Sequence, residues 1–233
     1  QRVVEQRGTI LLRYAEFDPA QFLPAVPDVL EATPENRAFI VQYISQPLEA
    51  YGDAIARLGG TVERFLPDQA QIVTIDPGMV DAVRALPFVR WVGEYHPAYK
   101  LDEPEIQRLT LGSFSDSFSQ RYSIQTLRRG DGSLDGLSQQ VREMGVRVDL
   151  ESEPVGRLEA WLTDEQVLEI AQRSDVLFMD FRGEPELDVD LARIIGGANY
   201  VESVAGFSGQ GVRAEVMDSG LFTGHQDTKP VDG

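Results

Sequence analysis

Two stretches of sequence, AFIVQY (Ala38–Tyr43) and YSIQTL (Tyr122–Leu127), decide the fold, because each opens a unit with the same order of elements. AFIVQY alternates apolar and polar residues in the manner of a β-strand. Apolar residues then recur at steps of three, four and three, which predicts a helix with one apolar face. These residues are Leu48, Tyr51, Ile55 and Leu58. Gly59 and Gly60 follow them, and glycine commonly ends a helix.

The first unit continues with three more strands and a second helix. Pro67 and Asp68 provide a turn between the first two of these strands. Asp76 caps the second helix, and Pro77 takes its first position, where proline is favoured. The strands are TVERFL at 61–66, QIVTI at 71–75 and VRWVGEY at 89–95. The predicted order of elements is therefore βαββαβ.

The second unit repeats this order 86 or 87 residues later. Its first helix carries the same steps of three, four and three and ends at Gly145. Thr163 and Gln166 form a capping box at the start of its second helix. The other repeated positions are Leu134, Leu137, Val141, Met144, Val167 and Ile170, with strands LEAWL at 158–162 and VLFMDF at 176–181. Such agreement indicates an internal duplication, and the alternative is two unrelated α+β segments.

A split βαββαβ unit folds as a ferredoxin-like sandwich, which is a four-stranded antiparallel sheet with two helices on one face. We therefore expect an α+β protein with two tandem ferredoxin-like domains. The other face of each sheet is expected to be open, either to solvent or to a partner. Trp91 and Trp161 lie on predicted strands and are expected in the core or on such a face, whereas His96 is expected at the surface.

The predicted units divide the chain into five parts. We expect an N-terminal extension at 1–37, a first domain at 38–100, a linker at 101–121 with the Ser-rich stretch GSFSDSFSQ, a second domain at 122–187, and a compositionally different tail at 188–233. The extension holds a candidate strand, Thr9 to Tyr14, and three candidate apolar anchors, Phe17, Phe22 and Leu23.

Composition excludes several classes of function. The net charge of −17 argues against binding of nucleic acid or an anionic membrane surface. No apolar run approaches the roughly 20 residues that span a bilayer. The chain has no cysteine and only two histidines, so thiolate and His-rich metal sites are excluded. The acidic stretch EPELDVD (184–190) reads as a solvated linker, with calcium binding as the alternative. Arg129-Gly130-Asp131 spells an adhesion tripeptide but lies in a glycine-rich loop.

The tail carries the chemically suggestive segment, GQGVRAEVMDSGLFTGHQD (Gly209–Asp227). Its Asp218 follows a short apolar strand, and the carboxyl end of a parallel strand is where α/β proteins place ligand-binding and catalytic groups. Gly220 permits a tight backbone path. A local triad of Asp218, Ser219 and His225 is not expected, because consecutive strand residues point to opposite faces.

This segment resembles the surroundings of the catalytic aspartate in subtilisin-like serine peptidases, although Glu215 stands where the family has a small residue. The two upstream units are similar to the propeptide domain of that family, at 38–95 and, less closely, at 122–181. The resemblance implies that Asp218 is the triad aspartate of a truncated α/β peptidase domain. It also implies that the upstream units assist folding of a peptidase domain and block its active site.

Further expectations follow from the resemblance. The family's triad runs Asp, His, Ser along the chain. The sequence has no His-Gly-Thr or Gly-Thr-Ser segment, so we expect it to be inactive alone and to be the N-terminal part of a secreted or cell-envelope endopeptidase. The resemblance implies no cofactor here, with calcium allowed in the full-length enzyme. The implied partners are its own or a cognate peptidase domain and, for the whole enzyme, protein or peptide substrates. The alternative is a non-enzymatic tandem module that binds a small ligand or inhibits a protease.

Overall fold

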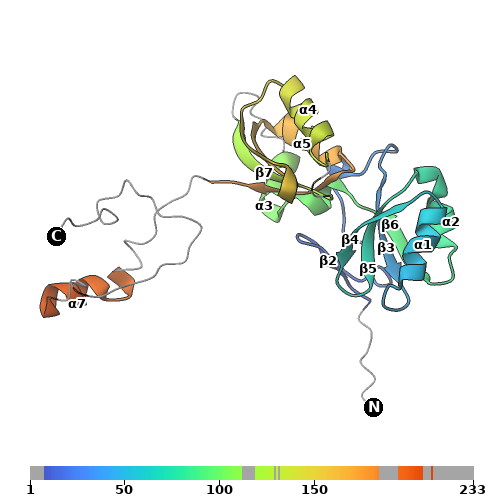
Figure 1. The fold of residues 1–233 in the computed structure, drawn as a ribbon, viewed down its shortest axis with the longest axis horizontal. Helices are drawn as coiled ribbons and strands as arrows, with labels where there is room; N and C mark the ends of the chain where they lie inside the picture. Colours follow the sequence, from blue (N-terminus) through green and yellow to red (C-terminus); the bar gives the residue numbers. More distant parts are fainter. Residues whose placement is uncertain are drawn as a thin grey trace, which may run out of the picture. The chain divides into compact units, whose positions relative to one another are not determined.

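The computed structural model describes residues 8–111, 119–128, 130, 132–183, 194–206 and 211. The chain forms two compact units, residues 1–183 and 184–233, and each is considered by itself. The larger unit is mixed α+β and holds three antiparallel sheets, two of them four-stranded (Figure 1). The predicted α+β class is therefore confirmed.

The first four-stranded sheet has the strand order β4-β5-β3-β6. Its elements are β3 (Ala38–Tyr43), α1 (Glu49–Arg57), β4 (Thr61–Leu66), β5 (Ala70–Thr74), α2 (Val80–Arg84) and β6 (Val89–Glu94). Phe39, Val41 and Tyr43 alternate along β3 and pack with Ile55 of α1 and Val83 of α2, so both helices cover one face (Figure 1). The predicted strands and helices of this unit are present, with a short 3-10 turn, η2 (Pro77–Met79), capped by Asp76 ahead of α2.

The second sheet has the order β10-β7-β9-β8, so the equivalent strands hold equivalent positions in both sheets. Its elements are β7 (Gln120–Thr126), α4 (Asp135–Glu143), β8 (Val148–Ser152), η4 (Glu153–Val155), β9 (Arg157–Leu162), α5 (Asp164–Gln172) and β10 (Val176–Phe181). The predicted capping box of Thr163 and Gln166 is present at the start of α5. Apolar residues of α4 and α5 cover one face of this sheet, which includes Tyr122 and Ile124.

The face of the first sheet that lies away from its helices is covered, which contradicts the expectation of an open face. Residues 8–30 supply the cover through the hairpin β1 (Ile10–Leu11) and β2 (Glu16–Phe17) and the 3-10 turn η1 (Asp28–Leu30). Ile10, Phe17 and Leu30 are buried in one cluster with Ile40 and Ile72 of the sheet. An apolar sheet face in water is unfavourable, and the extension removes it from solvent.

The N-terminal segment also differs from its predicted details. The candidate strand at 9–14 is only two residues long, because a turn joins Leu12 to Ala15. Phe17 is a buried anchor, but Phe22 and Leu23 are 55% and 59% exposed, so those two predictions are wrong. The physical reason is a turn at Asp18, whose carbonyl accepts the backbone N–H of Phe22 and leads the chain off the sheet face.

The predicted linker contains a helix that sequence analysis missed. α3 (Glu103–Thr110) begins at Asp102, whose side chain accepts the Glu105 N–H. Its buried Glu105 accepts the hydroxyl of Tyr122 at 2.6 Å, and Arg108 contacts Glu105, Tyr122 and Asp164. α3 is thereby fastened to β7 and to the start of α5. Residues 112–118 of the Ser-rich stretch lie outside the described residues.

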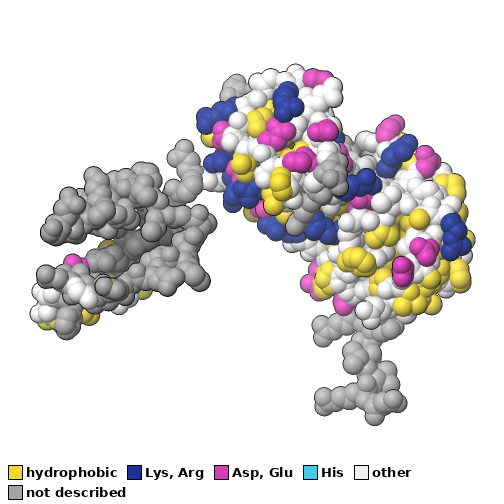
Figure 2. All heavy atoms as spheres, in the orientation of Figure 1, with side chains coloured by type: hydrophobic (Ala, Val, Ile, Leu, Met, Phe, Trp, Pro, Cys, Tyr) yellow, Lys and Arg dark blue, Asp and Glu magenta, His cyan; other side chains and the backbone are white. Residues whose placement is uncertain are grey.

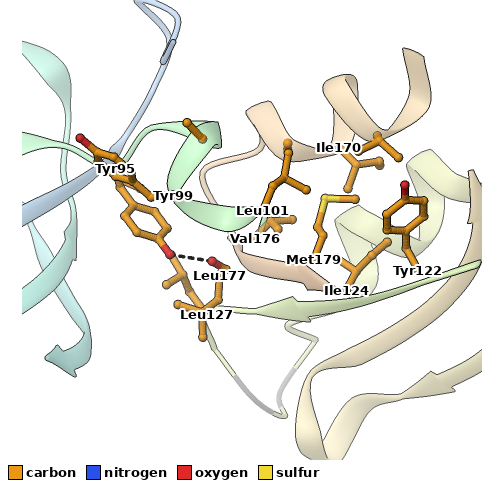
Figure 3. Packing of buried hydrophobic residues seen from close by; sticks show 14 of the residues in the cluster. Tyr95, Tyr99, Leu101, Tyr122, Ile124, Leu127, Ile170, Val176, Leu177 and Met179 are labelled. Atoms are coloured by element: carbon orange, nitrogen blue, oxygen red, sulfur yellow. Dashed lines mark hydrogen bonds between the residues drawn. The ribbon is translucent and has the colours of Figure 1, made fainter. Parts of the chain in front are cut away.

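A shared core joins the two sheets within the larger unit (Figure 3). Tyr95, at the end of β6, donates its hydroxyl to the Leu177 carbonyl of β10 at 2.6 Å. Lys100, at the end of η3 (Pro97–Lys100), is fully buried and donates to the carbonyls of Ala171 and Arg173 at the end of α5, both at 2.8 Å. Both predicted domains therefore belong to one compact unit.

In the smaller unit the described element is α7 (Ala198–Ala205), and its apolar residues Tyr200, Val201 and Val204 are exposed. The predicted strand before Asp218 lies outside the described residues, as do Glu215, Ser219 and His225. A search of the described helices finds none long and apolar enough to span a membrane.

Candidate functional site

The structure describes only some of the candidate functional residues that the sequence analysis named. Asp218, the predicted triad aspartate, lies outside the described residues, as do Arg129, Asp131 and the acidic stretch 184–190. His96 is half-buried rather than at the open surface, and its Nδ1 accepts the Ala32 N–H at 3.0 Å. Burial is the main cause that lowers the pKa of His96. No cluster of three or more metal-ligating side chains occurs among the residues that the structure describes.

The most distinctive surface is the face of the second sheet that lies away from α4 and α5, which we call the arginine face. Side chains alternate along β7 and β9, so Arg121, Arg157, Glu159 and Trp161 share this face while their neighbours enter the core. The cross-strand partners Arg121 and Trp161 confirm this placement. Arg182, just after β10, extends the ladder by donating its N–H to the Arg121 carbonyl.

A buried carboxylate organises the arginine face. The side chain of Glu159 is 3% exposed and pairs with Arg121 at 2.5 Å, Arg157 at 2.9 Å and Arg182 at 3.6 Å. A buried charge is costly unless it is paired, and three guanidinium groups supply the pairing here. Each guanidinium has five N–H donors, so the cluster keeps further donors for an acceptor that approaches from outside.

A second carboxylate, Asp149, lies beside this cluster on β8. It accepts Nε1 of Trp161 at 2.9 Å and pairs with Arg147 at 2.7 Å and Arg121 at 3.2 Å. The Trp161 hydrogen bond is the largest cause that lowers the pKa of Asp149. The guanidinium of Arg147 lies 5.4 Å from the Trp161 ring centre, and its side chain is 71% exposed. Trp161 is therefore held at a half-buried position on the sheet face.

The arginine face is positive on a strongly acidic protein. It combines Arg121, Arg147, Arg157 and Arg182 with the carboxylates Asp149, Glu159 and Asp180, whereas the whole chain has a net charge of −17. Figure 2 shows dark-blue Lys and Arg side chains gathered along one side of the lobe that holds β7. A local positive field of this kind attracts an acidic partner and repels a basic one.

One end of the arginine face contacts the N-terminal hairpin. Arg13 stacks over the ring of Phe178 at 4.3 Å and pairs with Asp180 at 2.7 Å, and Asp180 also accepts the hydroxyl of Tyr14. The hairpin thus touches the β10 end of this face but buries the centre of the equivalent face of the first sheet. The most exposed cations of the arginine face are Arg147, just before β8, and Arg182, just after β10, whereas Ser123, Gln125 and Glu159 on its central strands are buried.

A polar cleft of about 450 Å³ lies where the two sheets meet. Arg128 crosses it and pairs with Glu63 at 2.6 Å, and Glu63 also accepts the hydroxyl of Thr74. Hydroxyls of Thr61, Ser133 and Ser174 also line the cleft. Such a site is suited to a small polar ligand.

The comparisons with known proteins add one partial match. Residues 11–96 match the model of a domain of unknown function, DUF8729. The matched range includes most of the hairpin together with the first sheet, in agreement with their shared core. No curated protein and no solved structure matches the chain.

Proposed function

We propose that residues 38–183 form two ferredoxin-like units that act as the propeptide-like part of a subtilisin-like serine endopeptidase. The repeated strand order and the placement of both helices on one face of each sheet support the ferredoxin-like assignment. The segment 209–227 supports the peptidase assignment through its resemblance to the family's aspartate region, with Asp218 as the triad aspartate. Under this proposal the enzyme is secreted or held in the cell envelope.

The arginine face is the observation that carries the proposal. A propeptide-like unit needs a free sheet face to lie against a peptidase domain, and the first sheet has none because residues 8–30 cover it. The second sheet keeps exposed arginines on this face, with Arg147 71% exposed and Arg182 49% exposed, and the hairpin contacts only its β10 end. A rigid face of standard size, about 800 Å² on each partner, is enough for nanomolar affinity when it is preorganised. The second ferredoxin-like unit, which contains β7 to β10, is therefore the one proposed to contact the peptidase domain.

The first experiment measures inhibition of purified subtilisin, used as the probe peptidase, by the full chain. We expect saturable inhibition of peptide hydrolysis. Arg147→Glu, which reverses an exposed charge without touching Glu159, should weaken inhibition by about tenfold, equivalent to 1.4 kcal/mol. Arg57→Glu on α1 is the matched control and should leave inhibition unchanged. Absence of inhibition by the unmodified chain, or equal effects of both variants, would contradict the docking assignment.

Two simpler tests address the peptidase itself. The reading frame beyond codon 233 should encode a His-Gly-Thr and a Gly-Thr-Ser segment. The chain by itself should hydrolyse neither casein nor a chromogenic peptide. A continuing frame without those segments would remove the peptidase assignment and leave a free-standing inhibitor or ligand-binding tandem.

The ligand-binding alternative rests on the polar cleft between the sheets. It predicts that a small polar compound raises the unfolding temperature of the chain, because a ligand that binds only the folded state stabilises it. Arg128→Gln should abolish that increase, since Arg128 is the cation that crosses the cleft.

A further inference from the structure

The exposed edge of the first sheet has the features of a peptide-binding site. β6 is the last strand in the order β4-β5-β3-β6, and no strand in the described part of the chain pairs with its outer edge. The Tyr95 N–H donates to the Ala38 carbonyl of β3. Along an antiparallel strand, backbone groups point alternately toward the paired strand and away from it. The N–H and C=O groups of Val92 and Glu94 therefore point away from β3, toward the open edge. Unpaired edge groups of this kind are a template for another strand.

A cleft of about 630 Å³ lies along this edge, and we call it the edge cleft. One wall comes from the helix face of the sheet and includes Val80 and Arg84 of α2. The other wall comes from the opposite face and includes Leu23, Pro24 and Trp91. The cleft therefore wraps around the strand edge and occupies the position that a fifth strand would take.

The edge cleft is lined by both apolar and charged side chains, and its apolar part is firmly supported. Phe39, Val92 and Tyr99 are each at most 6% exposed. The indole of Trp91 packs edge-on to Phe17 with ring centres 5.9 Å apart. It also lies across Gly93, where an added Cβ would be 2.2 Å from the ring. The site is preorganised, which reduces the entropy cost of binding.

The charges of the edge cleft favour a cationic occupant. Its carboxylates are Glu31, Asp81 and Glu94, and its one arginine, Arg84, is already paired with Asp81 at 2.5 Å. The charges of Glu94 and Glu31 act to raise the pKa of His96, but burial is the largest cause and the net shift is downward. Within the described residues, Glu31 and Glu94 have no ion-pair partner.

We propose that the edge cleft binds an extended peptide that adds as a fifth strand beside β6 and carries Lys or Arg next to apolar side chains. The main chain of the peptide pairs with the outward groups of Val92 and Glu94. Its side chains alternate between the wall at Val80 and the wall at Leu23, and its cations meet Glu31 and Glu94. This proposal does not depend on the peptidase assignment, because the arginine face is on the other sheet.

The test uses the full chain with Trp161→Phe, which leaves Trp91 as its one tryptophan and makes fluorescence report on the cleft. The probe is a capped nine-residue peptide that alternates valine and lysine. Two matched peptides serve as controls, one with glutamate in place of lysine and one with alternate amides N-methylated. Sedimentation of the free protein monitors self-association.

We expect saturable binding of the lysine peptide and at least about tenfold weaker binding of both control peptides. The double variant Glu31→Gln, Glu94→Gln should weaken binding of the lysine peptide by about fivefold or more. The charge-matched control Glu143→Gln, Glu165→Gln should bind as the parent does, since both residues lie on the second unit. Lack of saturation up to about 1 mM, equal binding of the N-methylated peptide, or a dimer formed through this edge would overturn the proposal.

Discussion

Replacing Lys100 with methionine tests how the two halves of the larger unit are joined. Lys100 is fully buried, and its Nζ donates to the carbonyls of Ala171 and Arg173, both at 2.8 Å. These carbonyls lie at the C-terminal end of α5, where backbone acceptors have no partner within the helix. Methionine has nearly the same length but no donor, so the packing stays while both hydrogen bonds are lost.

The size of the effect follows from those two carbonyls. A buried polar group left without a partner costs about 1–3 kcal/mol, which gives about 2–6 kcal/mol for the two oxygens. Removing the buried amine relieves its own desolvation, so we expect a net loss of about 2–4 kcal/mol in the free energy of unfolding. That is a large share of the stability of an ordinary domain.

The effect should also depend on pH, in a definite direction. Burial lowers the pKa of Lys100 from 10.5 to about 7 in the folded chain. Between these two pKa values, Lys100 is protonated in the unfolded chain and neutral in the folded chain. Raising the pH therefore increases the free energy of unfolding through this lysine, by up to about 1.4 kcal/mol per pH unit. Lys100→Met lacks this contribution. The difference between the parent and the variant should therefore widen from pH 7 upward.

Urea unfolding, followed by circular dichroism at about pH 7 and about pH 9, measures this difference. Arg57→Met is the control, because it removes a positive charge from the exposed surface of α1 and should change stability by no more than about 0.5 kcal/mol. A Lys100→Met protein as stable as the parent, or a stability difference that is the same at both pH values, would refute the reasoning.

Two further pairs of variants test the packing by the same urea measurement. Phe17→Ala should lower the free energy of unfolding by about 3–5 kcal/mol, because it uncovers the first sheet. Phe22→Ala, at a 55% exposed position, should lower it by no more than about 0.5 kcal/mol. Similar losses for the two variants would contradict the covering role of the hairpin. Gly93→Ala should cost about 1–3 kcal/mol because its Cβ would meet the Trp91 ring at 2.2 Å. Gly52→Ala, in α1 with open space around the new methyl group, should stabilise by about 0.5–1 kcal/mol; a destabilised Gly52→Ala would show that the packing at the helix is misjudged.

The sequence allowed the elements to be predicted because their signals are local. The helical steps from Leu48 to Leu58 and the Thr163 capping box depend on neighbours within a few residues, and the structure confirms both elements. α3 was missed because its apolar face is short, with Leu109 as its one buried aliphatic residue, and because a serine-rich stretch follows it. Local patterns therefore identified the repeated elements but not the helix between them.

The residues that join or cover the sheets could not be predicted in the same way. Lys100 resembles a surface lysine in sequence, and its partners are more than 70 residues away. Phe17 and Phe22 are the same residue type in the same segment, and only a turn at Asp18 separates a buried anchor from an exposed ring. The arginine face also depends on partners brought together across strands, with Arg121 38 residues from Glu159. Such contacts are decided by the tertiary fold.

The two sheets differ most in the face that lies away from their helices, and this difference restricts where a partner can bind. The central strands of the first sheet present Ala38, Ile40 and Ile72 on that face, and such a surface must be covered for the chain to fold in water. The central strands of the second sheet present Glu159, which is buried but paired with three arginines, and Arg157, whose side chain is 37% exposed. A partner that approaches the first unit therefore finds only its strand edges and helices, whereas a partner of the second unit can use the exposed arginines of a sheet face that the hairpin contacts only at its β10 end. Under the two proposals, the arginine face binds an acidic surface and the edge cleft binds a basic strand, so the asymmetry separates the two partners.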